Sequence, residues 1–544
     1  MSEGYLCLLL HCHLPFVRHP EYDQFLEENW LFEAVTETYL PLLERLQRLH
    51  REGTEYRISF SITPTLCEML ADELLQERCG RYVRARKQLM EQELERTRNT
   101  PFERVARMYY KRFEDIESSY GNRAGQALLT GLRQLQNEGV IEVLTSTATH
   151  ALLPLMATQE GARAQIEQGC RNYEKHFGTR PRGIWLPECA YNNGLDELLK
   201  QSGLRYFFLE SHGVLLAEPR PVYGVFSPII TPAGLAAFGR DVETSKQVWS
   251  TDEGYPGDPE YREFHRDLGY DADYDAIKPY LDPAGQRHEV GIKYHRITGD
   301  VPLEDKEPYR PKMANQKARD HAAHFVSERI KQIDQLAKVI DQYPLISSPY
   351  DAELFGHWWF EGPIFLESVL QLTDDKKKSG KTQDASLLQT VTPSEYLTKN
   401  PRHQLASPAP STWGYEGYFD VWVNGSNDWI CRHLLAAEQT MVKLANEYSS
   451  ADGAQKRTLD QCARELMLAQ SSDWPFLLSV GTARDYARYR VENHIGRFQS
   501  LCRALEEEDI SEEHLEQIEN RDNIFPEIDY RIYGSAVDRF SGES

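Results

Sequence analysis

The stretch YLCLLLHCHLPF, residues 5 to 16, decides the fold of this chain of 544 residues. It is almost continuously apolar up to Leu10 and then turns polar at His11 and His13. An apolar run of this length is typical of a strand that is buried on both faces, as in a parallel sheet. We therefore expect a parallel strand here, with both histidines at its carboxyl end.

Strand and helix patterns alternate along the rest of the chain. Strand-like runs are YRISFSITPTL (56–66), VIEVLTSTATHALLPL (140–155), GIWLPE (183–188), LRYFFLES (204–211) and YPLISSPYDAELFG (343–356). Helical spacing marks LFEAVTETYLPLLERLQRLH (31–50) and FVSERIKQIDQLAKVIDQ (325–342). Repeated strand–helix units predict an α/β fold built on a parallel sheet or barrel, with the active site at the carboxyl ends of the strands.

Changes in composition divide the chain into domains. Residues 68–136 are dense in Arg, Glu and Lys, which we interpret as a helical insertion. DDKKKSGKTQD (374–384) and NPRHQLASPAPS (400–411) are predicted to be exposed loops. The predicted organisation is a barrel (1–67 and 137–399), the insertion (68–136), a C-terminal helical domain (400–525) and a tail (526–544).

Composition excludes several classes of protein. A net charge of -23 opposes binding to nucleic acid or to anionic lipid, and no apolar run approaches the ~20 residues that span a bilayer. The nine cysteines are scattered without a C-x-x-C pair, and MSEGYLCLLL (1–10) lacks a basic leader region. We expect a reduced, monomeric, cytoplasmic protein with a neutral substrate and no cofactor.

Glu188 has almost no polar neighbours within PRGIWLPECAYNNGLDELL (181–199). It could cap a helix, but Asn193 is the better candidate for the cap of the following amphipathic segment. An acid among apolar residues needs a solvent-reached cleft or a shifted pKa. Glu188 is therefore predicted to be functional, together with His11, His13, His150 and Asp351, which also follow predicted strands.

The pair of histidines in HCHLP leaves two interpretations open. Alternate residues on a strand face the same way, so His11 and His13 could bind a metal or hydrogen-bond a sugar. A catalytic metal would need a third protein ligand, for which Asp351 or His150 could serve, but no tight H-x-x-x-H pattern supports one. We favour sugar binding and expect no metal.

Aromatic residues accompany the carboxylates in two segments. SSPYDAELFGHWWFEGP (347–363) places Asp351 close to Trp358, and STWGYEGYFDVWVNGSNDW (411–429) carries Trp413 and Trp422 among Gly, Asn and Asp. Sugar rings stack their C–H faces on aromatic planes, while their hydroxyls bond carboxylates, amides and imidazoles. Two carboxylates from different strands with aromatic surroundings are the minimum equipment of a glycosidase.

Five short regions in order resemble glycoside hydrolase family 57. They are HCHLPF (11–16), EVLTSTATHALLP (142–154), GIWLPECAY (183–191), SSPYDAELFGHWW (347–359) and LAQSSDWPF (468–476). WLPECAY and SPYDAELFGHWW are most similar to those of the 1,4-α-glucan branching enzymes of that family. The resemblance implies a (β/α)7 barrel with an inserted helical domain and a C-terminal all-helical domain.

The resemblance also implies the roles of individual residues. Glu188 would be the nucleophile and Asp351 the general acid/base of a retaining mechanism acting on an α-glucan such as amylose, glycogen or starch. The predicted substrate-binding residues are His11, His13, Trp30, His150, Trp185, Phe238, Arg262, Trp358, Trp413, Trp422 and Asp473. Branching members carry a Tyr at the tip of a mobile loop after the fifth strand, where TPAGLAAFGRDVETSKQVWS (231–250) is expected to place Phe238.

The sequence is compatible with four functions. The first is 1,4-α-glucan branching in glycogen or starch metabolism, and the second is hydrolysis or 4-α-glucan transfer by the same two carboxylates. The third is a metal-dependent polysaccharide deacetylase that uses HCH as ligands, and the fourth is a non-catalytic glucan-binding protein. Product linkage separates the first two, and chelation tests the third.

Overall fold

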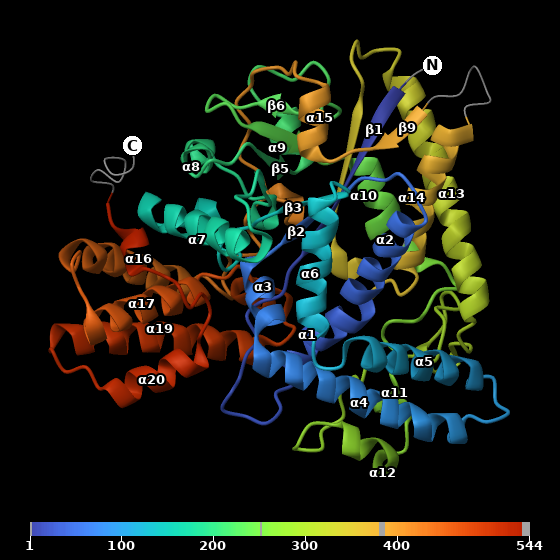
Figure 1. The fold of residues 1–544 in the computed structure, drawn as a ribbon, viewed down its shortest axis with the longest axis horizontal. Coiled ribbons are helices and arrows are strands. Elements are labelled where there is room, and N and C mark those ends of the chain that lie inside the picture. Colours follow the sequence, from blue (N-terminus) through green and yellow to red (C-terminus); the bar gives the residue numbers. More distant parts are fainter. Residues whose placement is uncertain (1–2, 251–252, 380–386, 536–544) are drawn as a thin grey trace.

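A ring of parallel strands forms the centre of the protein (Figure 1). The structure is a computed structural model that describes residues 3–250, 253–379 and 387–535. The strands of the ring are β1 (Glu3–Cys12), β2 (Ile58–Ile62), β3 (Ile141–Leu144), β4 (Gly183–Ile184), β5 (Tyr206–Leu209), β7 (Ala236–Gly239) and β8 (Leu345–Asp351). Two further strands flank them, with β6 (Ile229–Ile230) antiparallel to β7 and β9 (Leu387–Thr390) parallel to β1.

Backbone pairing links these parallel strands into a closed path. One sheet runs in the order β3-β2-β1-β8 and the other contains β4-β5-β7. A parallel bridge between Thr145 and Ile184 joins β3 to β4. The amide of Asp241, just after β7, donates to the carbonyl of Ser347 in β8 at 2.9 Å. This connectivity is that of the expected seven-stranded barrel.

Side chains of the strands alternate between the inside and the outside of the ring, as the pleat requires. Tyr5, Cys7 and Leu9 of β1 pack in one buried cluster with Trp185 and Phe208. The intervening leucines of β1 pack instead in the large cluster beneath the surrounding helices. The barrel interior is therefore filled with side chains below its carboxyl-terminal rim.

Strand register brings the first polar residues together at that rim. His11 continues the inward-facing row of β1 beyond Leu9. It is paired in register with Ser61 of β2 on one side and with Asp351 of β8 on the other. The prediction that the ends of distant strands meet at one edge is confirmed for these residues.

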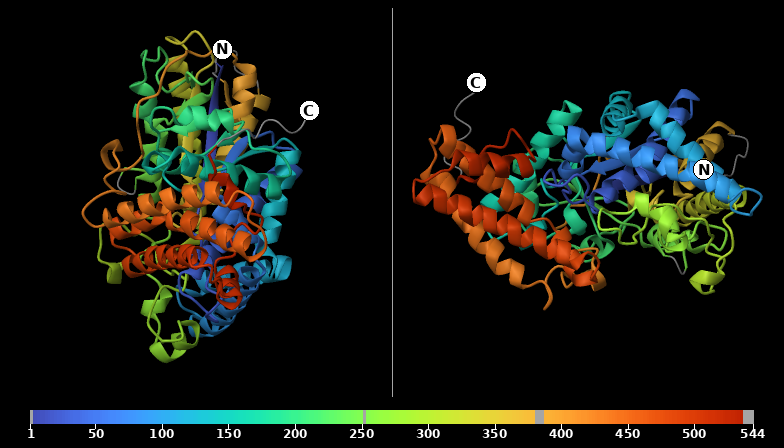
Figure 2. Two further views of the ribbon diagram at one scale, coloured as in Figure 1. Left: turned by 90° about the vertical axis from the view of Figure 1, so that its left-hand side faces the viewer. Right: turned by 90° about the horizontal axis from the view of Figure 1, so that it is seen from below.

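Helices cover the barrel and extend from it (Figures 1 and 2). Those up to β8 are α1 (Glu28–Ala34), α2 (Leu40–Arg51), α3 (Pro64–Ala71), α4 (Glu73–Arg96), α5 (Glu103–Tyr120), α6 (Ala124–Asn137), α7 (Gln159–Phe177), α8 (Leu195–Gln201), α9 (Ser211–Leu215), α10 (Val242–Trp249), α11 (Leu268–Asp271), α12 (Tyr274–Ile277) and α13 (Pro311–Leu336). Those after β8 are α14 (Gly362–Ser379), α15 (Pro393–Lys399), α16 (Trp429–Glu447), α17 (Gly453–Ala469), α18 (Asp473–Val480), α19 (Arg484–Glu506) and α20 (Glu512–Arg521).

Capping residues explain where two long helices begin and end. The carboxylate of Asp72 accepts a hydrogen bond from the Leu75 amide at the start of α4. Thr158 caps α7 in the same way, and Gly178 ends it in the left-handed conformation that glycine adopts without strain. The expected cap at Asn193 is wrong, because α8 follows Gly194 and has no side-chain cap.

The segment predicted as an insertion is helical, but its helices differ in position. α4 and α5 lie together along the lower edge of the molecule in Figure 1. α6 instead packs against α2 and β3, so it covers the barrel. A second excursion, residues 253–310 between β7 and β8, packs on α4 and α5, for example where Tyr294 donates to Glu93 at 2.9 Å. The strand and helix patterns of the sequence do not predict this excursion.

The C-terminal helices α16, α17, α19 and α20 group at one end of the molecule (Figure 2). Before them, the chain stays on the barrel, where Ser411 pairs with Tyr191. Residues 526–535 also differ from the predicted tail, because Tyr530 and Tyr533 are fully buried there. Of the predicted lysine-rich loop (374–384), residues 374–379 continue α14, and residues 380–384 lie outside the described residues.

Candidate active site

Three histidines from two strand ends stack at the mouth of the barrel. The Nδ1 of His11 bonds the Ser61 hydroxyl at 3.2 Å, and its Nε2 lies 3.1 Å from Nε2 of His150. The rings of His13 and His150 stack with centroids 3.7 Å apart. Burial and the nearby His13 keep the pKa of both His11 and His150 well below the ordinary value. Both are therefore neutral, and each of their ring nitrogens has a hydrogen-bond partner within the protein.

His13 pairs with Asp473, which follows it by most of the length of the chain. Both carboxylate oxygens of Asp473 lie 3.0 Å from the His13 Nε2. Burial opposes charge on either partner, but the attraction between them is larger: it raises the pKa of His13 and lowers that of Asp473 to about 2. This ion pair anchors the start of α18 to the barrel rim.

Glu188 sits in a strained turn directly after β4. It has φ +59° and Cys189 has φ +50°, a left-handed conformation that residues with a Cβ rarely adopt. Such strain is found mainly at functional sites, where the surrounding structure holds it. The Trp413 indole donates to one carboxylate oxygen at 2.6 Å and the Ser472 hydroxyl to the other at 3.3 Å. These two donors hold the carboxylate in one orientation.

The two predicted catalytic carboxyl groups occupy desolvated positions. Burial raises the pKa of Glu188 to about 7, although the bonds from Trp413 and Ser472 favour its charged form. Burial raises the pKa of Asp351 well above its ordinary value, and the neighbouring charges of Glu353 and Glu188 raise it further. The two carboxyl groups differ in their partners: Trp413 and Ser472 donate to Glu188 and favour its charged form, while the charges of Glu353 and Glu188 favour the protonated form of Asp351.

A row of tryptophans leads from Glu188 to the surface. The ring centroids of Trp413 and Trp249 are 6.3 Å apart, and those of Trp249 and Trp358 are also 6.3 Å apart. Trp358 is 44% exposed, so the row ends in solvent. The partly buried Trp30 makes an edge-to-face contact with Tyr486, with ring centroids 5.8 Å apart. These rings offer the flat apolar faces on which sugar units stack.

Phe238 is not at a loop tip, and that expectation is wrong. It lies within β7, is fully buried, and stacks on Phe208 with centroids 5.1 Å apart. The reason is strand alternation: the run that reads as a small-residue loop pairs with β5 and points Phe238 into the barrel. Phe238 therefore has no surface with which to contact substrate.

Arg262 is likewise buried rather than exposed to a groove. Its side chain is ion-paired with Glu37 at 2.8 Å and donates to the Tyr109 hydroxyl and to the His357 carbonyl. Its guanidinium also lies 4.2 Å from the Phe360 ring centroid. Arg262 joins the excursion of residues 253–310 to the loop that carries Trp358, so its predicted contact with substrate is wrong.

Two predicted tryptophans lie beneath the site instead of lining it. Trp185 is fully buried, stacks on the His11 ring with centroids 4.9 Å apart, and meets the Trp413 ring at a tilt with centroids 5.0 Å apart. Trp422 is 3% exposed and packs against Leu152 and Ala190. Both rings support the residues above them. The sequence shows that tryptophans are present in these segments, but it does not show which of them are buried in the fold.

Several residues at the site were missed. Ser472 bonds both Glu188 and His150, the latter at 2.9 Å. Trp249 completes the tryptophan row, and Glu353 accepts hydrogen bonds from the Tyr39 hydroxyl and the His13 amide. Ser472 lies beside Asp473 in LAQSSDWPF, and Glu353 lies two residues after Asp351 in SSPYDAELFGHWW. Their positions within these two family-like regions could have identified them.

A metal-ligand geometry is also present. One possible ligand atom from each of His13, His150 and Asp473 lies within 4.8 Å of the other two. Asp473 is thus a third possible ligand, which the spacing of residues in the sequence did not indicate. In this arrangement, however, both ring nitrogens of His13 and of His150 already have hydrogen-bond partners. The cluster is satisfied as a hydrogen-bonded network.

Comparisons with known proteins match this arrangement along the whole chain. Residues 7–408 match the model of glycosyl hydrolase family 57, and residues 433–533 match that of the 1,4-alpha-glucan branching enzyme C-terminal region. A curated 1,4-alpha-glucan branching enzyme of Thermococcus kodakarensis is 34% identical over 96% of this chain and 77% of its own.

Solved structures are similar over almost their full lengths. The alpha-amylase AmyC of Thermotoga maritima is 42% identical, with a TM-score of 0.90 over 98% of this chain and 100% of its own. A branching enzyme of Pyrococcus horikoshii is 35% identical, with a TM-score of 0.86 over 98% and 97%. With its α/β core, its C-terminal helices and the carboxylates at the rim of its barrel, this chain belongs to glycosyl hydrolase family 57.

Proposed function

We propose that this protein is a 1,4-α-glucan branching enzyme. It cuts an α-1,4 bond, holds the released chain on Glu188 and delivers it to a 6-hydroxyl of an acceptor glucan. The observation that carries branching in particular is the match of residues 433–533 to the C-terminal region of branching enzymes. The curated relative of that name supports the same assignment.

Two displacements at one carbon make up the proposed reaction. The Glu188 carboxylate attacks C1 and forms a glycosyl ester, while Asp351 gives its proton to the departing 4-oxygen. Asp351 then takes the proton of the acceptor 6-hydroxyl, whose oxygen attacks C1 and frees Glu188. Two inversions retain the α configuration. A separation of roughly 5 to 7 Å between the carboxyl groups is expected for this mechanism.

The neighbouring groups have supporting roles in this proposal. When substrate binds, His11 and His150 exchange the contact between their Nε2 atoms for hydroxyls of the sugar whose C1 reacts, and His13, held in place by Asp473, lies stacked beside them. Trp413, Trp249 and Trp358 bind further units of the chain. Transfer must prevail over reaction with water at ~55 M, so the acceptor must be held against the ester.

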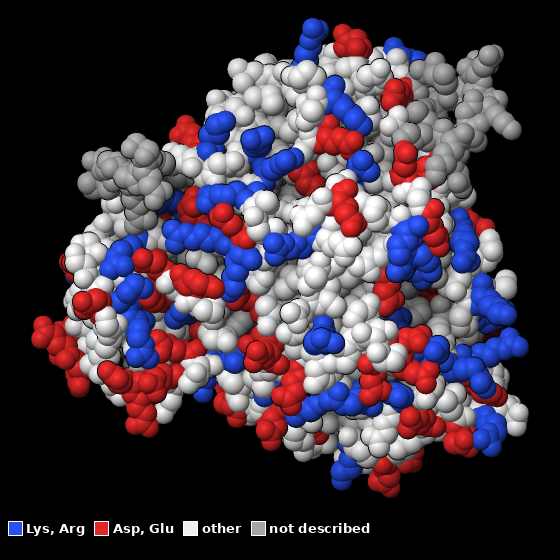
Figure 3. Space-filling model, viewed as in Figure 1, with Lys and Arg blue, Asp and Glu red and all other residues white. Residues whose placement is uncertain are grey.

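Charge distribution is consistent with a neutral polysaccharide. On the face drawn in Figure 3, Lys and Arg are interspersed with Asp and Glu, and acids gather over the C-terminal helices. Nucleic acid would need a continuous basic surface. Among the described residues, no helix is both long and apolar enough to cross a bilayer. The unpaired cysteines, of which Cys431 alone is exposed, support a reducing cytoplasmic location, and we expect a monomer.

The test is product linkage. Incubation with amylose followed by proton NMR counts new α-1,6 linkages against new reducing ends. Branching predicts α-1,6 linkages in excess. Reducing ends without α-1,6 linkages would instead assign hydrolysis, the alternative that the similarity to an alpha-amylase keeps relevant. Redistribution of α-1,4 chain lengths without either product would assign 4-α-glucan transfer.

A further inference from the structure

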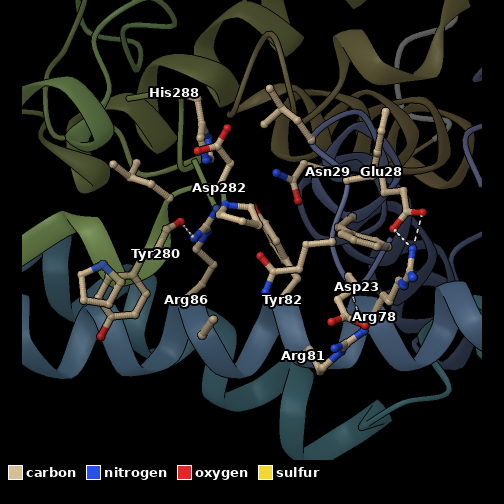
Figure 4. Close-up of a pocket in the computed structure, with 18 residues that line it drawn as sticks. Asp23, Glu28, Asn29, Arg78, Arg81, Tyr82, Arg86, Tyr280, Asp282 and His288 are labelled. Carbon is tan, nitrogen blue, oxygen red and sulfur yellow. Dashed lines mark hydrogen bonds and ion pairs between the residues drawn. The ribbon is translucent and has the colours of Figure 1, made fainter. Parts of the chain in front are cut away.

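A second cavity lies away from the catalytic groups, where the start of α1 meets α4 and the excursion around residues 279–288 (Figure 4). Its volume is about 140 Å³, below the roughly 300 to 1,000 Å³ of sites for drug-sized ligands. Phe25, Phe32 and Tyr82 supply an aromatic lining. A cavity of this size and lining suits one small ring.

Polar atoms without protein partners face the same space. In the described parts of the chain, the side-chain carboxamide of Asn29 makes no hydrogen bond, whereas its backbone N–H donates to the Leu26 carbonyl at 3.0 Å. His288 bonds the Glu289 carbonyl through Nδ1 at 2.7 Å, which leaves Nε2 open, and one oxygen of Asp282 remains open beside the bond to the Gln286 amide. Figure 4 shows Asn29 and Asp282 across the cavity from the side chains that rise from α4. These groups can both donate to and accept from hydroxyls.

Arg86 provides an independent sign of a missing ligand. It is 3% exposed, yet no carboxylate of the described residues lies within 4 Å, and its Nε has no partner. It donates to the Tyr280 carbonyl at 3.3 Å and lies 4.6 Å over the Tyr82 ring. Arg78, by contrast, is paired with Glu28 at 2.6 Å. A buried guanidinium whose Nε has no partner is costly unless a polar ligand bonds it.

The charges that line the cavity favour a neutral occupant. Arg78 and Glu28 neutralise each other, and the rest of the lining carries Arg81 and Arg86 together with Asp23 and Asp282, so its formal charge sums to zero without an ion pair between these four. An anion such as phosphate would meet the two unpaired aspartates. A neutral ring with several hydroxyls matches the aromatic lining, the open donors and the open acceptors together.

We propose that this cavity binds one glucosyl unit of the α-glucan, as a binding site separate from the catalytic cleft. Asn29 of the cavity precedes Trp30, a predicted substrate-binding residue whose ring meets Tyr486 edge-on at 5.8 Å. A chain bound in the cavity is thereby held next to the cleft, which raises the local concentration of long substrates. This inference rests on the proposed function, because the ligand is its substrate.

Binding is tested in the full-length Glu188→Gln protein, which does not turn substrate over. Maltotriose is titrated by calorimetry and by saturation-transfer NMR. Asn29→Ala and Asp282→Ala remove single bonding groups, and Ala85→Trp fills the cavity from α4. Asn493→Ala, at a half-buried position on α19 that does not line the cavity, is the matched control. The cavity variants are expected to lose one class of maltotriose sites, and the control is expected to keep both.

Kinetics provides the second readout, with Glu188 intact. Asn29→Ala is expected to raise KM for amylose about fivefold, the loss of roughly one hydrogen bond, without changing kcat. The shortest maltooligosaccharide that is cut should show no change. Identical maltotriose binding and identical KM in all variants would overturn the proposal, as would displacement of maltotriose from the cavity by inorganic phosphate.

The two proposals fail in different ways. An active enzyme whose amylose kinetics ignore the cavity variants would overturn this inference and leave the branching proposal intact. A protein without activity on amylose would overturn the proposed function, and the calorimetric comparison of Asn29→Ala with Asn493→Ala would still decide whether the cavity binds maltotriose.

Discussion

The indole nitrogen of Trp413 lies 2.6 Å from a carboxylate oxygen of Glu188, and the Trp413 amide also donates to the Glu188 carbonyl at 3.0 Å. The segment between the barrel and the C-terminal helices thus holds the predicted nucleophile by both its side chain and its backbone. Because a tryptophan N–H only donates, this bond favours the charged carboxylate. The contact therefore affects the pH at which Glu188 is ionised.

Trp413→Phe is expected to move the acidic limb of the pH profile to higher pH. Glu188 must be ionised to attack, and burial already raises its pKa to about 7. Removing a donor that lowers this pKa leaves less carboxylate at neutral pH. The lost bond to a charged group corresponds to about 1.5 to 3 kcal/mol, or roughly tenfold or more in kcat/KM on the acidic limb. Trp358→Phe is the control, and the measurement is kcat/KM between pH 5 and 9. An acidic limb that stays in place would contradict this role of Trp413.

Glu188→Gln and Asp351→Asn are each expected to abolish turnover. Removing the nucleophile or the proton donor deletes a bond-making role, so kcat should fall by about 10⁴-fold or more. Removal of one stacking ring by Trp358→Ala should cost only ~1 kcal/mol in kcat/KM. Initial rates on amylose give the comparison, and retained maltotriose binding shows that the variants fold. Near-native activity of Glu188→Gln would disprove its assignment.

Sequence reasoning succeeded where local periodicity determines position. A buried strand ends at His11, and parallel pairing alone brings His11 and Asp351 to one rim. It failed where tertiary packing decides whether a side chain is covered. Phe238, Trp185 and Arg262 have the residue types of a sugar site, but packing from other segments encloses each one.

Contacts between residues far apart in the sequence were also not predicted. His13 and Asp473 meet only because α18 folds back onto the barrel rim, and neither periodicity nor spacing encodes that return. The family resemblance supplied Asp473 as a candidate without its partner. In the same way, Arg86 gives no signal in the sequence that distinguishes it from the other arginines of its charged helix.

Exhaustive chelation is expected to leave activity within about twofold of its starting value. His11 and His150 bond each other through Nε2, and His13 is paired with Asp473 as a charged partner, so the cluster is satisfied as it stands. Activity on amylose is measured after dialysis against EDTA, and metal content is measured before and after. Loss of activity that zinc restores would favour a metal-dependent reaction, including the deacetylase alternative.

Arg262→Met is expected to destabilise the protein without removing a substrate contact. It leaves Glu37 buried without its main partner, a change that costs about 3 to 5 kcal/mol. The additional change Glu37→Gln should recover most of the loss, since no unpaired charge then remains. Urea unfolding midpoints report this, with the exposed Arg319→Met as control. A KM for amylose that rises severalfold while stability is unchanged would restore the original interpretation of Arg262 as a substrate ligand.

Phe238→Tyr distinguishes a barrel-core residue from a loop-tip residue. At a loop tip over the active site, an added hydroxyl would lower the ratio of reducing ends to α-1,6 linkages. Within β7, the added hydroxyl enters a cluster of aromatic rings that includes Tyr206 at 5.6 Å and Phe208 at 5.1 Å. Burying a hydroxyl there costs about 1 to 3 kcal/mol unless it finds a partner. We therefore expect a lower unfolding midpoint and an unchanged product ratio, whereas Phe476→Tyr, at a position that is 41% exposed, should change neither. A changed product ratio at unchanged stability would contradict the buried position, because a side chain without exposed surface can reach the glycosyl ester only by leaving the core.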